Sequence, residues 1–93
     1  MALAVKLTAS GQVGTGPVRV YGYSIKGGSD AMTVAFANQA TASGTELEGY
    51  GAATGVYASP NIGNFIDFSV ACYATITGTA PVVWVKYSPI PNG

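Results

Sequence analysis

The stretch FIDFSVACYATIT, from Phe65 to Thr77, alternates apolar and polar side chains more regularly than any other part of the chain. Successive side chains of a β-strand point to opposite faces, so this period of two predicts one long, half-buried strand. The apolar face would carry Ile66, Phe68, Val70, Cys72, Ala74 and Ile76. Such a face needs a second sheet, or a neighbour's sheet, to cover it.

Six further segments have the composition of strands, and residues that favour turns separate them. These segments are residues 2–9, 18–26, 31–37, 46–50, 55–59 and 82–88. The turn composition KGGSD predicts that 18–26 and 31–37 pair as a hairpin. No window has a helical period. The expected fold is therefore all-β, an antiparallel sandwich or a small barrel of six to eight short strands.

The 93 residues form one expected domain, 1–93, in which 89–93 is an extended tail. A domain of this size buries only about 60 to 65% of its unfolded surface, so partner chains would help to stabilise it. Charged residues make up only 9% of the chain, against about 25% in an average soluble domain. Four basic and four acidic residues give a net charge of zero, which tolerates association between copies.

The distribution of charge and of apolar residues argues against two classes of partner. The basic residues form no cluster along the chain, so binding to nucleic acid or to an anionic membrane surface is not expected. No run approaches the roughly 20 apolar residues of a membrane-spanning helix. The N-terminal MALAVKLTASG is typical of a strand rather than of a signal peptide, which predicts a soluble protein made in the cytoplasm.

The chain has no histidine, so the commonest general base and the commonest ligand of catalytic zinc are missing. Glu46 and Glu48 are expected on one strand face, and Asp67 on the polar face of residues 65–77. A glycosidase would need two carboxyl groups held across a cleft. Solvated surface carboxylates are the favoured interpretation, so no enzyme and no cofactor are predicted.

Three local features resemble binding sites but have simpler explanations. The glycine-rich segments 11–16 and 49–55 lack the following helix that a phosphate-binding loop requires, so they are interpreted as turns. Asp30 and Gly28 lie in an oxygen-rich turn, but no loop has the dense acidic spacing of a calcium site, and no metal is predicted. Cys72 has no partner for a disulfide and is expected to fill the core.

Aromatic side chains remain as candidates for binding. Tyr21 and Tyr23 are two residues apart and are expected on one strand face, while Tyr73 and Trp84 point away from the apolar sides of their strands. Exposed rings of this kind stack on sugars or pack between subunits, although internal packing should account for about half of them.

A glycine interrupts the strand sequence VYGYS. Glycine inside a strand marks a bulge or a place where another group approaches closely. Gly22 is therefore predicted to let a neighbouring ring or chain pass between Tyr21 and Tyr23, so that Gly22→Val would disrupt assembly or packing.

The motifs occur in the order VRVYGYSIKGG, AMTVAFANQATASGTELEGYG, SPNIGNFIDFSVACYATITGT and VVWVKYSP. This order, over residues 18–89, resembles that of short virion proteins encoded among tailed-phage structural genes. In those proteins a Tyr-Gly step opens one strand, and a step of Gly, any residue and Phe begins a long strand ending in Thr-Gly-Thr. A Val-rich strand ending in Tyr closes the fold. The loop ANQAT departs from the pattern because it lacks an acidic turn, so no contact or cation of that turn is carried over.

The resemblance implies a single antiparallel β-sandwich, jelly-roll-like, of six to eight short strands. It also implies a non-enzymatic structural protein of the bacteriophage virion, made in the host cytoplasm. Such subunits often form trimers on a capsid or tail surface as decoration, cement or fibre-base components. The expected partners are copies of the chain itself, as a homotrimer, and the major capsid protein or another virion protein. The expected interface residues are Arg19, Tyr21, Gly22, Tyr23, Tyr73 and Trp84. The expected core residues are Val34, Phe36, Ile66, Phe68, Val70, Ile76, Val83 and Val85.

The alternative prediction belongs to a different class of function. It is a carbohydrate-binding β-sandwich module of a receptor-binding or cell-surface protein, whose exposed rings would stack on sugars.

Overall fold

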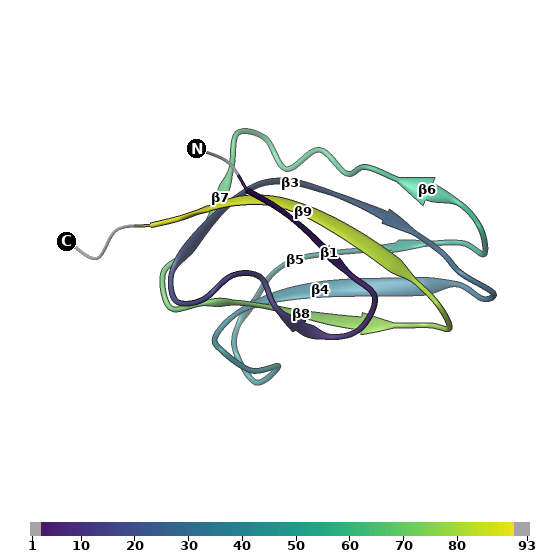
Figure 1. Cartoon of the computed structure of the whole chain (residues 1–93), viewed down its shortest axis with the longest axis horizontal. Helices are drawn as coiled ribbons and strands as arrows, with labels where there is room; N and C mark the ends of the chain where they lie inside the picture. The colour runs from purple at the N-terminus through teal and green to yellow at the C-terminus, as the bar shows by residue number, and fades with distance from the viewer. Residues whose placement is uncertain (1–2, 91–93) are drawn as a thin grey trace.

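The computed structural model describes residues 3–90, and the regular structure in this range consists of strands alone (Figure 1). The strands are β1 (Leu3–Leu7), β2 (Gly11–Gln12), β3 (Val18–Lys26), β4 (Met32–Asn38), β5 (Glu46–Ala52), β6 (Tyr57–Ala58), β7 (Ile66–Phe68), β8 (Cys72–Thr77) and β9 (Val82–Pro89). Within residues 3–90, no helix is long and apolar enough to cross a membrane.

The strands form two antiparallel sheets that pack face to face (Figure 1). Sheet A has the order β1-β9-β3-β6, with β7 also paired to β3, and sheet B has the order β2-β8-β4-β5. The pairing is nested: the first strand pairs with the last, β2 with β8, β3 with β6 and β7, and β4 with β5. This nesting is the jelly-roll arrangement, which confirms the predicted fold class. Nine strands replace the expected six to eight because the short strand β2 was not predicted and the predicted strand over residues 65–77 is divided into β7 and β8.

The core lies between the sheets and contains most of the predicted residues. Val34, Phe36, Phe68, Val83 and Val85 are buried, and Ile66 and Ile76 are partly buried against them. Cys72 is buried as predicted, and burial raises the pKa of its thiol to about 12. Removal of this apolar surface from water is the main source of stability in a domain of this kind.

The predicted single strand over residues 65–77 is wrong, because the chain changes sheet in its middle. β7 belongs to sheet A and β8 to sheet B, and the segment between them crosses the side of the sandwich. Asn38 holds this crossing, because its side chain accepts a hydrogen bond from the Val70 amide at 2.9 Å and donates one to Ser69 at 3.2 Å. Val70 is 51% exposed, so its assignment to the core is also wrong.

The predicted hairpin of residues 18–26 and 31–37 is wrong for the same reason. β3 pairs with strands of sheet A, whereas β4 pairs with β5 and β8 in sheet B. The two strands face each other across the core instead of lying side by side. Their connection packs against the β8–β9 loop, where Ser29 donates its amide to the carbonyl of Thr79 at 3.0 Å.

The glycine-rich segment before β3 is more than the predicted turn. Gly11 and Gln12 pair with β8, and Val13 is fully buried. The amide of Val13 donates to the carbonyl of Cys72 at 2.8 Å. Val13 is the only branched apolar residue in the glycine-rich segment 11–16, and this was the sequence signal for its core position.

Candidate functional site on the outer face of sheet A

The outer face of sheet A is the solvent side of β1, β9, β3, β6 and β7. Directly opposed residues of antiparallel strands share a face. Val85 is buried, so its neighbours Trp84 and Lys86 point outward. Lys6 of β1 lies opposite Trp84, and Gly22 of β3 lies opposite Lys86. Side chains from separate parts of the sequence therefore meet on this face.

A β-bulge in β3 decides which tyrosine belongs to this face. The register with β9 shifts between Val20 and Gly22, so Tyr21 is the extra residue. The bulge resets the alternation, because Val20 and Tyr23 both enter the core although three positions separate them. Tyr21 is 41% exposed and Tyr23 only 5%. A bulge was one of the two features that a glycine inside a strand marks, and it lies directly before Gly22. The prediction that Tyr21 and Tyr23 share a face is wrong.

Gly22 opens onto free space. A Cβ atom built on it would meet no atom of another residue within 4 Å, its chain neighbours apart. Within residues 3–90, no ring or chain segment passes closely over this glycine. The neighbouring group that was predicted to pass between Tyr21 and Tyr23 is therefore not found in that range.

Tyr23 is a core residue with one polar partner. Its ring packs edge-on against Phe36, with centroids 4.8 Å apart at 66°. Its hydroxyl donates to Glu48 at 2.7 Å. Burial, followed by this hydrogen bond, raises the pKa of Tyr23 well above the usual value of a phenol. The structure therefore places Tyr23 inside the sandwich and away from the expected interface. Tyr73 lies opposite Gln12 and Ala37 in sheet B, apart from the other predicted interface residues.

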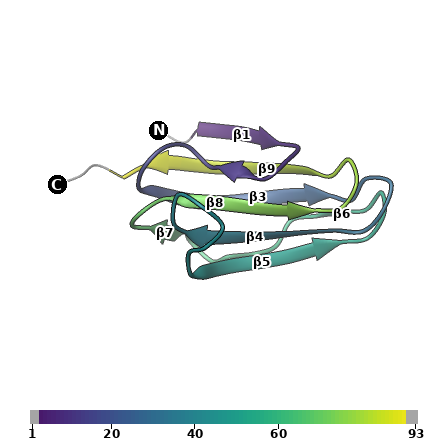
Figure 2. The same cartoon turned by 90° about the horizontal axis from the view of Figure 1, so that it is seen from below.

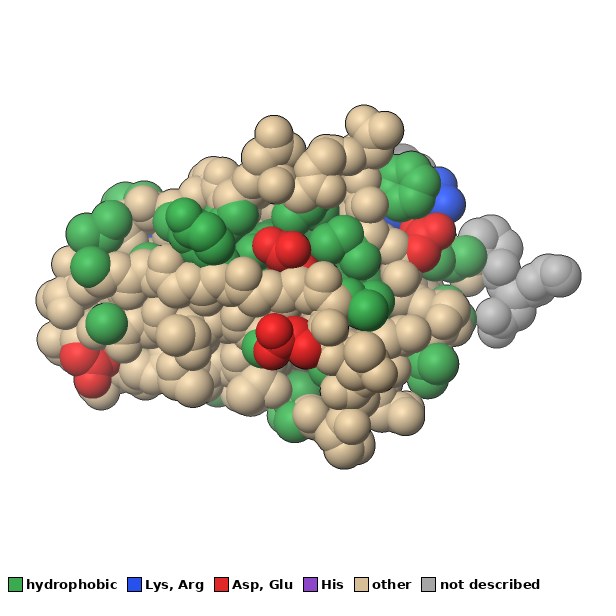
Figure 3. All heavy atoms as spheres, turned by 180° about the vertical axis from the view of Figure 1, so that it is seen from behind, with side chains coloured by type: hydrophobic (Ala, Val, Ile, Leu, Met, Phe, Trp, Pro, Cys, Tyr) green, Lys and Arg blue, Asp and Glu red, His purple; other side chains and the backbone are tan. Residues whose placement is uncertain are grey.

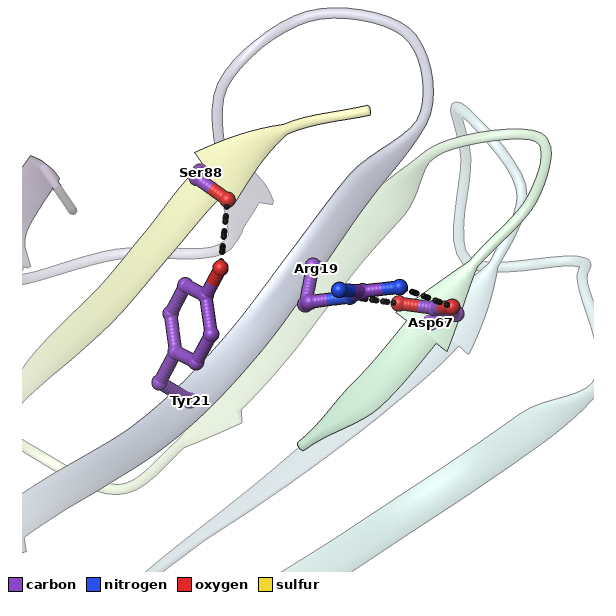
Figure 4. Close-up of polar contacts among 4 residues, drawn as sticks. All are labelled: Arg19, Tyr21, Asp67 and Ser88. Carbon is purple, nitrogen blue, oxygen red and sulfur yellow. Dashed lines mark hydrogen bonds and ion pairs between the residues drawn. The ribbon is translucent and has the colours of Figure 1, made fainter. Parts of the chain in front are cut away.

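Arg19 and Asp67 form an ion pair at one end of this face. Figure 4 shows the guanidinium of β3 lying alongside the carboxylate of β7, with N–O distances of 2.7 and 3.1 Å. The hydrogen bond from Arg19 lowers the pKa of Asp67 below its usual value. The guanidinium also lies 3.9 Å from the ring centroid of Phe65. This pair cancels the charge of the only arginine.

A groove of about 440 Å³ lies on this face, over β1, β3 and β9. Tyr21 and Trp84 line it, and Ala4 and Gly22 leave space on either side of Lys86. The hydroxyl of Tyr21 is hydrogen-bonded to Ser88 of β9 at 3.0 Å (Figure 4). Hydroxyl groups also enter the groove from Ser24 and Ser59, whose oxygens are 2.9 Å apart. The lining thus combines ring faces, hydroxyls and one ammonium group.

A second pair of rings extends the face beyond the groove. Tyr57 of β6 is 65% exposed and stacks on Trp84, with centroids 6.2 Å apart and planes inclined by 19°. The ammonium of Lys26 lies 5.1 Å from the centroid of Tyr57. The sequence interpretation missed Tyr57, although its position in a predicted edge strand was a signal for exposure.

The fold gathers positive charge on this face. Cross-strand pairing places every basic residue there: Lys6, Arg19, Lys26 and Lys86. Asp67 is the only carboxylate among the cross-strand neighbours on the face. The side of the molecule turned away in Figure 1 shows carboxylates at several places and basic side chains only at one edge (Figure 3). The basic residues are far apart in the sequence, so the sequence alone did not predict that they would lie on one face.

The remaining carboxylates serve local contacts. Both oxygens of Asp30 accept hydrogen bonds from Thr79, at 2.6 Å from its amide and 3.1 Å from its hydroxyl. The described residues contain no group of three or more possible metal ligands of the His, Cys, Asp and Glu types. Asp30 thus connects the β3–β4 loop to the β8–β9 loop through these two hydrogen bonds.

The prediction that Glu46 and Glu48 share a face is wrong. A register shift makes them oppose Ala37 and Phe36, which are adjacent residues of β4 and therefore point to opposite sides. A cleft with paired carboxylates is not formed by these two residues.

Comparison of the chain with protein-family models, with curated proteins and with solved structures finds no match. The interpretation of the outer face therefore depends on its own chemistry. That chemistry is a groove lined by two aromatic residues and Lys86, on a face whose lysines have no ion-pair partner in residues 3–90.

Proposed function

We propose that the protein is a non-enzymatic structural subunit of a phage virion, which forms a homotrimer and decorates or cements the capsid or another virion surface. The observation that carries this proposal is a pair of open strand edges on opposite flanks of the sandwich (Figure 2). β1 borders sheet A and β5 borders sheet B, and each pairs with one strand only. An open edge presents unpaired amides and carbonyls to another chain.

The two flanks are chemically complementary. Leu3 on β1 is 43% exposed, and Leu47 on β5 is 41% exposed. β1 carries Lys6, whereas β5 carries Glu46 and Glu48. Contacts between unlike surfaces of identical chains form closed rings when the rotation between copies permits it. A ring of three is the size that the resemblance to virion proteins implies.

Two observations support a role without catalysis. The chain has no histidine, and the carboxylates of Asp30, Glu48 and Asp67 are engaged by Thr79, Tyr23 and Arg19. The proposed partners are other copies and the major capsid protein or another virion protein, in the virion after synthesis in the host cytoplasm. No cofactor, nucleic acid or membrane is part of the proposal.

Light scattering behind size exclusion tests the assembly. We expect three chains per particle at micromolar concentration, and a shift to monomer on Tyr50→Ser at the β5 flank. Val70→Ser is the matched control, because both side chains are 51% exposed but Val70 lies on the crossing between β7 and β8. A monomeric parent protein, or equal effects of the two substitutions, would contradict the proposed assembly.

The virion location has a separate test. Mass spectrometry of purified particles of the encoding phage should detect the protein in a fixed ratio to the major capsid protein. Its absence from the particles would reject the virion role even if the protein is a trimer.

The groove favours the alternative function, a carbohydrate-binding module. Aromatic faces beside hydroxyl groups are a common lining for sugars, and Tyr21 and Trp84 with Ser24 and Ser59 provide both. The only tryptophan of the chain lies in this lining, so its fluorescence should respond to a bound saccharide. A monomer that responds to a saccharide panel would favour this function over the structural one.

A further inference from the structure

The charge around the groove distinguishes between classes of ligand. Lys86 lines the groove, and Lys6 lies directly opposite Trp84 on the neighbouring strand. Lys26 lies at the ring of Tyr57, which stacks on Trp84. Arg19 is already paired with Asp67. Lys86 thus contributes an ammonium group to the groove itself, and Lys6 and Lys26 lie on the same face of the sheet. None of the three has a carboxylate within ion-pair distance in residues 3–90.

The lining supplies the other contacts that a sugar ring requires. Ser24 and Ser59 offer hydroxyl groups that both donate and accept hydrogen bonds. Trp84 and Tyr21 contribute aromatic rings to the lining, against which the apolar face of a pyranose can pack. The lack of a side chain at Gly22, with its open space, leaves room for the ligand beside Lys86.

We propose that this groove binds an acidic saccharide, with a carboxylate of the sugar on Lys86 and its ring against Trp84. The proposal rests on the alternative function, a carbohydrate-binding module, and specifies in addition that the bound saccharide is negatively charged. It is compatible with the structural role, since a virion subunit can assemble through its flanks and present this face to solvent. A carboxylate beside an ammonium group forms a charge-assisted hydrogen bond, which is stronger than a neutral one.

Other classes of ligand fit the observations less well. A neutral sugar would leave the ammonium group of Lys86, which lines the groove, without a charged partner. A single-stranded nucleic acid derives most of its affinity from many phosphate contacts, and three unpaired lysines supply few. A volume of about 440 Å³ is that of a small-ligand site, which suits one or two sugar rings.

A matched pair of probes isolates the charge. Oligogalacturonate and its fully methyl-esterified form share the same rings and linkages but differ in ionisation. We expect the acid to change the fluorescence of Trp84 in a saturable way, and the ester to bind at least about tenfold more weakly, as for the loss of one charge-assisted hydrogen bond. The affinity for the acid should also fall as salt is added, because the lysines are at the surface.

Two variants locate the binding in the groove. Lys86→Gln should weaken binding of the acid by about tenfold. Gly22→Val should abolish it by filling the space beside Lys86, where an added Cβ atom meets no residue other than its chain neighbours within 4 Å. Circular dichroism of the variant checks that the fold is kept. Asp30→Asn, in the loop between β3 and β4, is the control that changes the net charge by one unit away from the groove. It keeps an acceptor for the Thr79 amide and should bind as the parent does.

Each outcome has one meaning. Equal binding of acid and ester would reject the proposal that the ligand is acidic, but it would support the carbohydrate-binding function. No response to either probe, with folded protein at millimolar saccharide, would overturn both. Tighter binding of an oligothymidylate than of the acid would assign the face to nucleic acid instead and reject the proposal. Full binding by Gly22→Val would also reject it, because the ligand would then lie elsewhere.

Discussion

Single residues decide which side chains belong to the core and which to the surface. Tyr23 is the clearest case, because one extra residue at Tyr21 turns its ring inward, where its hydroxyl meets Glu48. No periodicity in the sequence reveals such a step, since the bulge itself breaks the period. Gly22 was the only signal for it. The bulge at Leu47 in β5 had no comparable signal, and the relative orientation of Glu46 and Glu48 was therefore mispredicted.

The buried phenol predicts a loss of stability in alkali. The pKa of Tyr23 is raised by burial and by Glu48, so the native state holds its proton above pH 10, where an unfolded tyrosine ionises. Its contribution to stability is complete below about pH 10 and is lost as the pH rises above that value. Urea unfolding from pH 8 to 11 should show this decline above pH 10, added to the loss from the Cys72 thiol, whose pKa burial raises to about 12. Tyr23→Phe should reduce the slope above pH 10.

Tyr23→Phe should also cost about 1 kcal/mol at pH 7, because Glu48 loses its donor. Tyr57→Phe, at a ring that is 65% exposed, is the control and should keep the alkaline slope of the parent. Identical slopes in parent and Tyr23→Phe would show that another group causes the alkaline loss.

At the scale of elements, the sequence identified most strands but not the sheet to which each belongs. Alternation shows which side of a strand is apolar. Both sheets of a sandwich turn their apolar sides to one core, so β7 and β8 look continuous in the sequence although they lie in different sheets. The same ambiguity made β3 and β4 resemble a hairpin. Lys6, Lys26 and Lys86 were not recognised as a group because they come from three different strands.

The crossing from β3 to β4 requires a residue without a side chain at Gly28. A Cβ atom there would overlap the backbone oxygens of Thr79 and Ala80, and backbone atoms cannot move aside without separating the two loops. Gly28→Ala should destabilise the fold by about 2 kcal/mol, which corresponds to a fall in Tm of roughly 8–16 °C. Thermal unfolding followed by circular dichroism measures this shift.

Gly22→Ala is the matched control for that substitution. Its added methyl group meets open space, so its effect on stability should stay within about 0.5 kcal/mol. If Gly28→Ala melted together with Gly22→Ala, the packing of the β3–β4 loop against the β8–β9 loop would not contribute to stability.

The whole molecule has no net charge, but its positive and negative side chains lie on different parts of the surface. Its cations lie on the outer face of sheet A, whereas Glu46 and Glu48 lie on β5, across the sandwich from β1 (Figure 2). Net charge alone, which is all that composition provides, cannot distinguish this arrangement from a uniform mixture. In the proposed ring, the β1 flank of one subunit meets the β5 flank of the next, so unlike charges meet at every contact.

A charge exchange tests this arrangement. Lys6→Glu and Glu46→Lys, each alone, should raise the concentration for half-dissociation of the trimer by about tenfold or more, because like charges then face each other. The double substitution should restore assembly to near the parent level. Sedimentation velocity over a dilution series measures all four proteins. Additive losses in the double variant would show that Lys6 and Glu46 do not meet across the contact.

Burial of the only cysteine has a practical consequence. Cys72 is covered within the core, and its raised pKa leaves little thiolate near neutral pH. A thiol reagent reaches it only when the two sheets part, so the rate of alkylation counts the openings of the sandwich. The alkylation rate of Cys72 therefore reports how often the sandwich opens, in the free protein or in an assembled particle, without an added label.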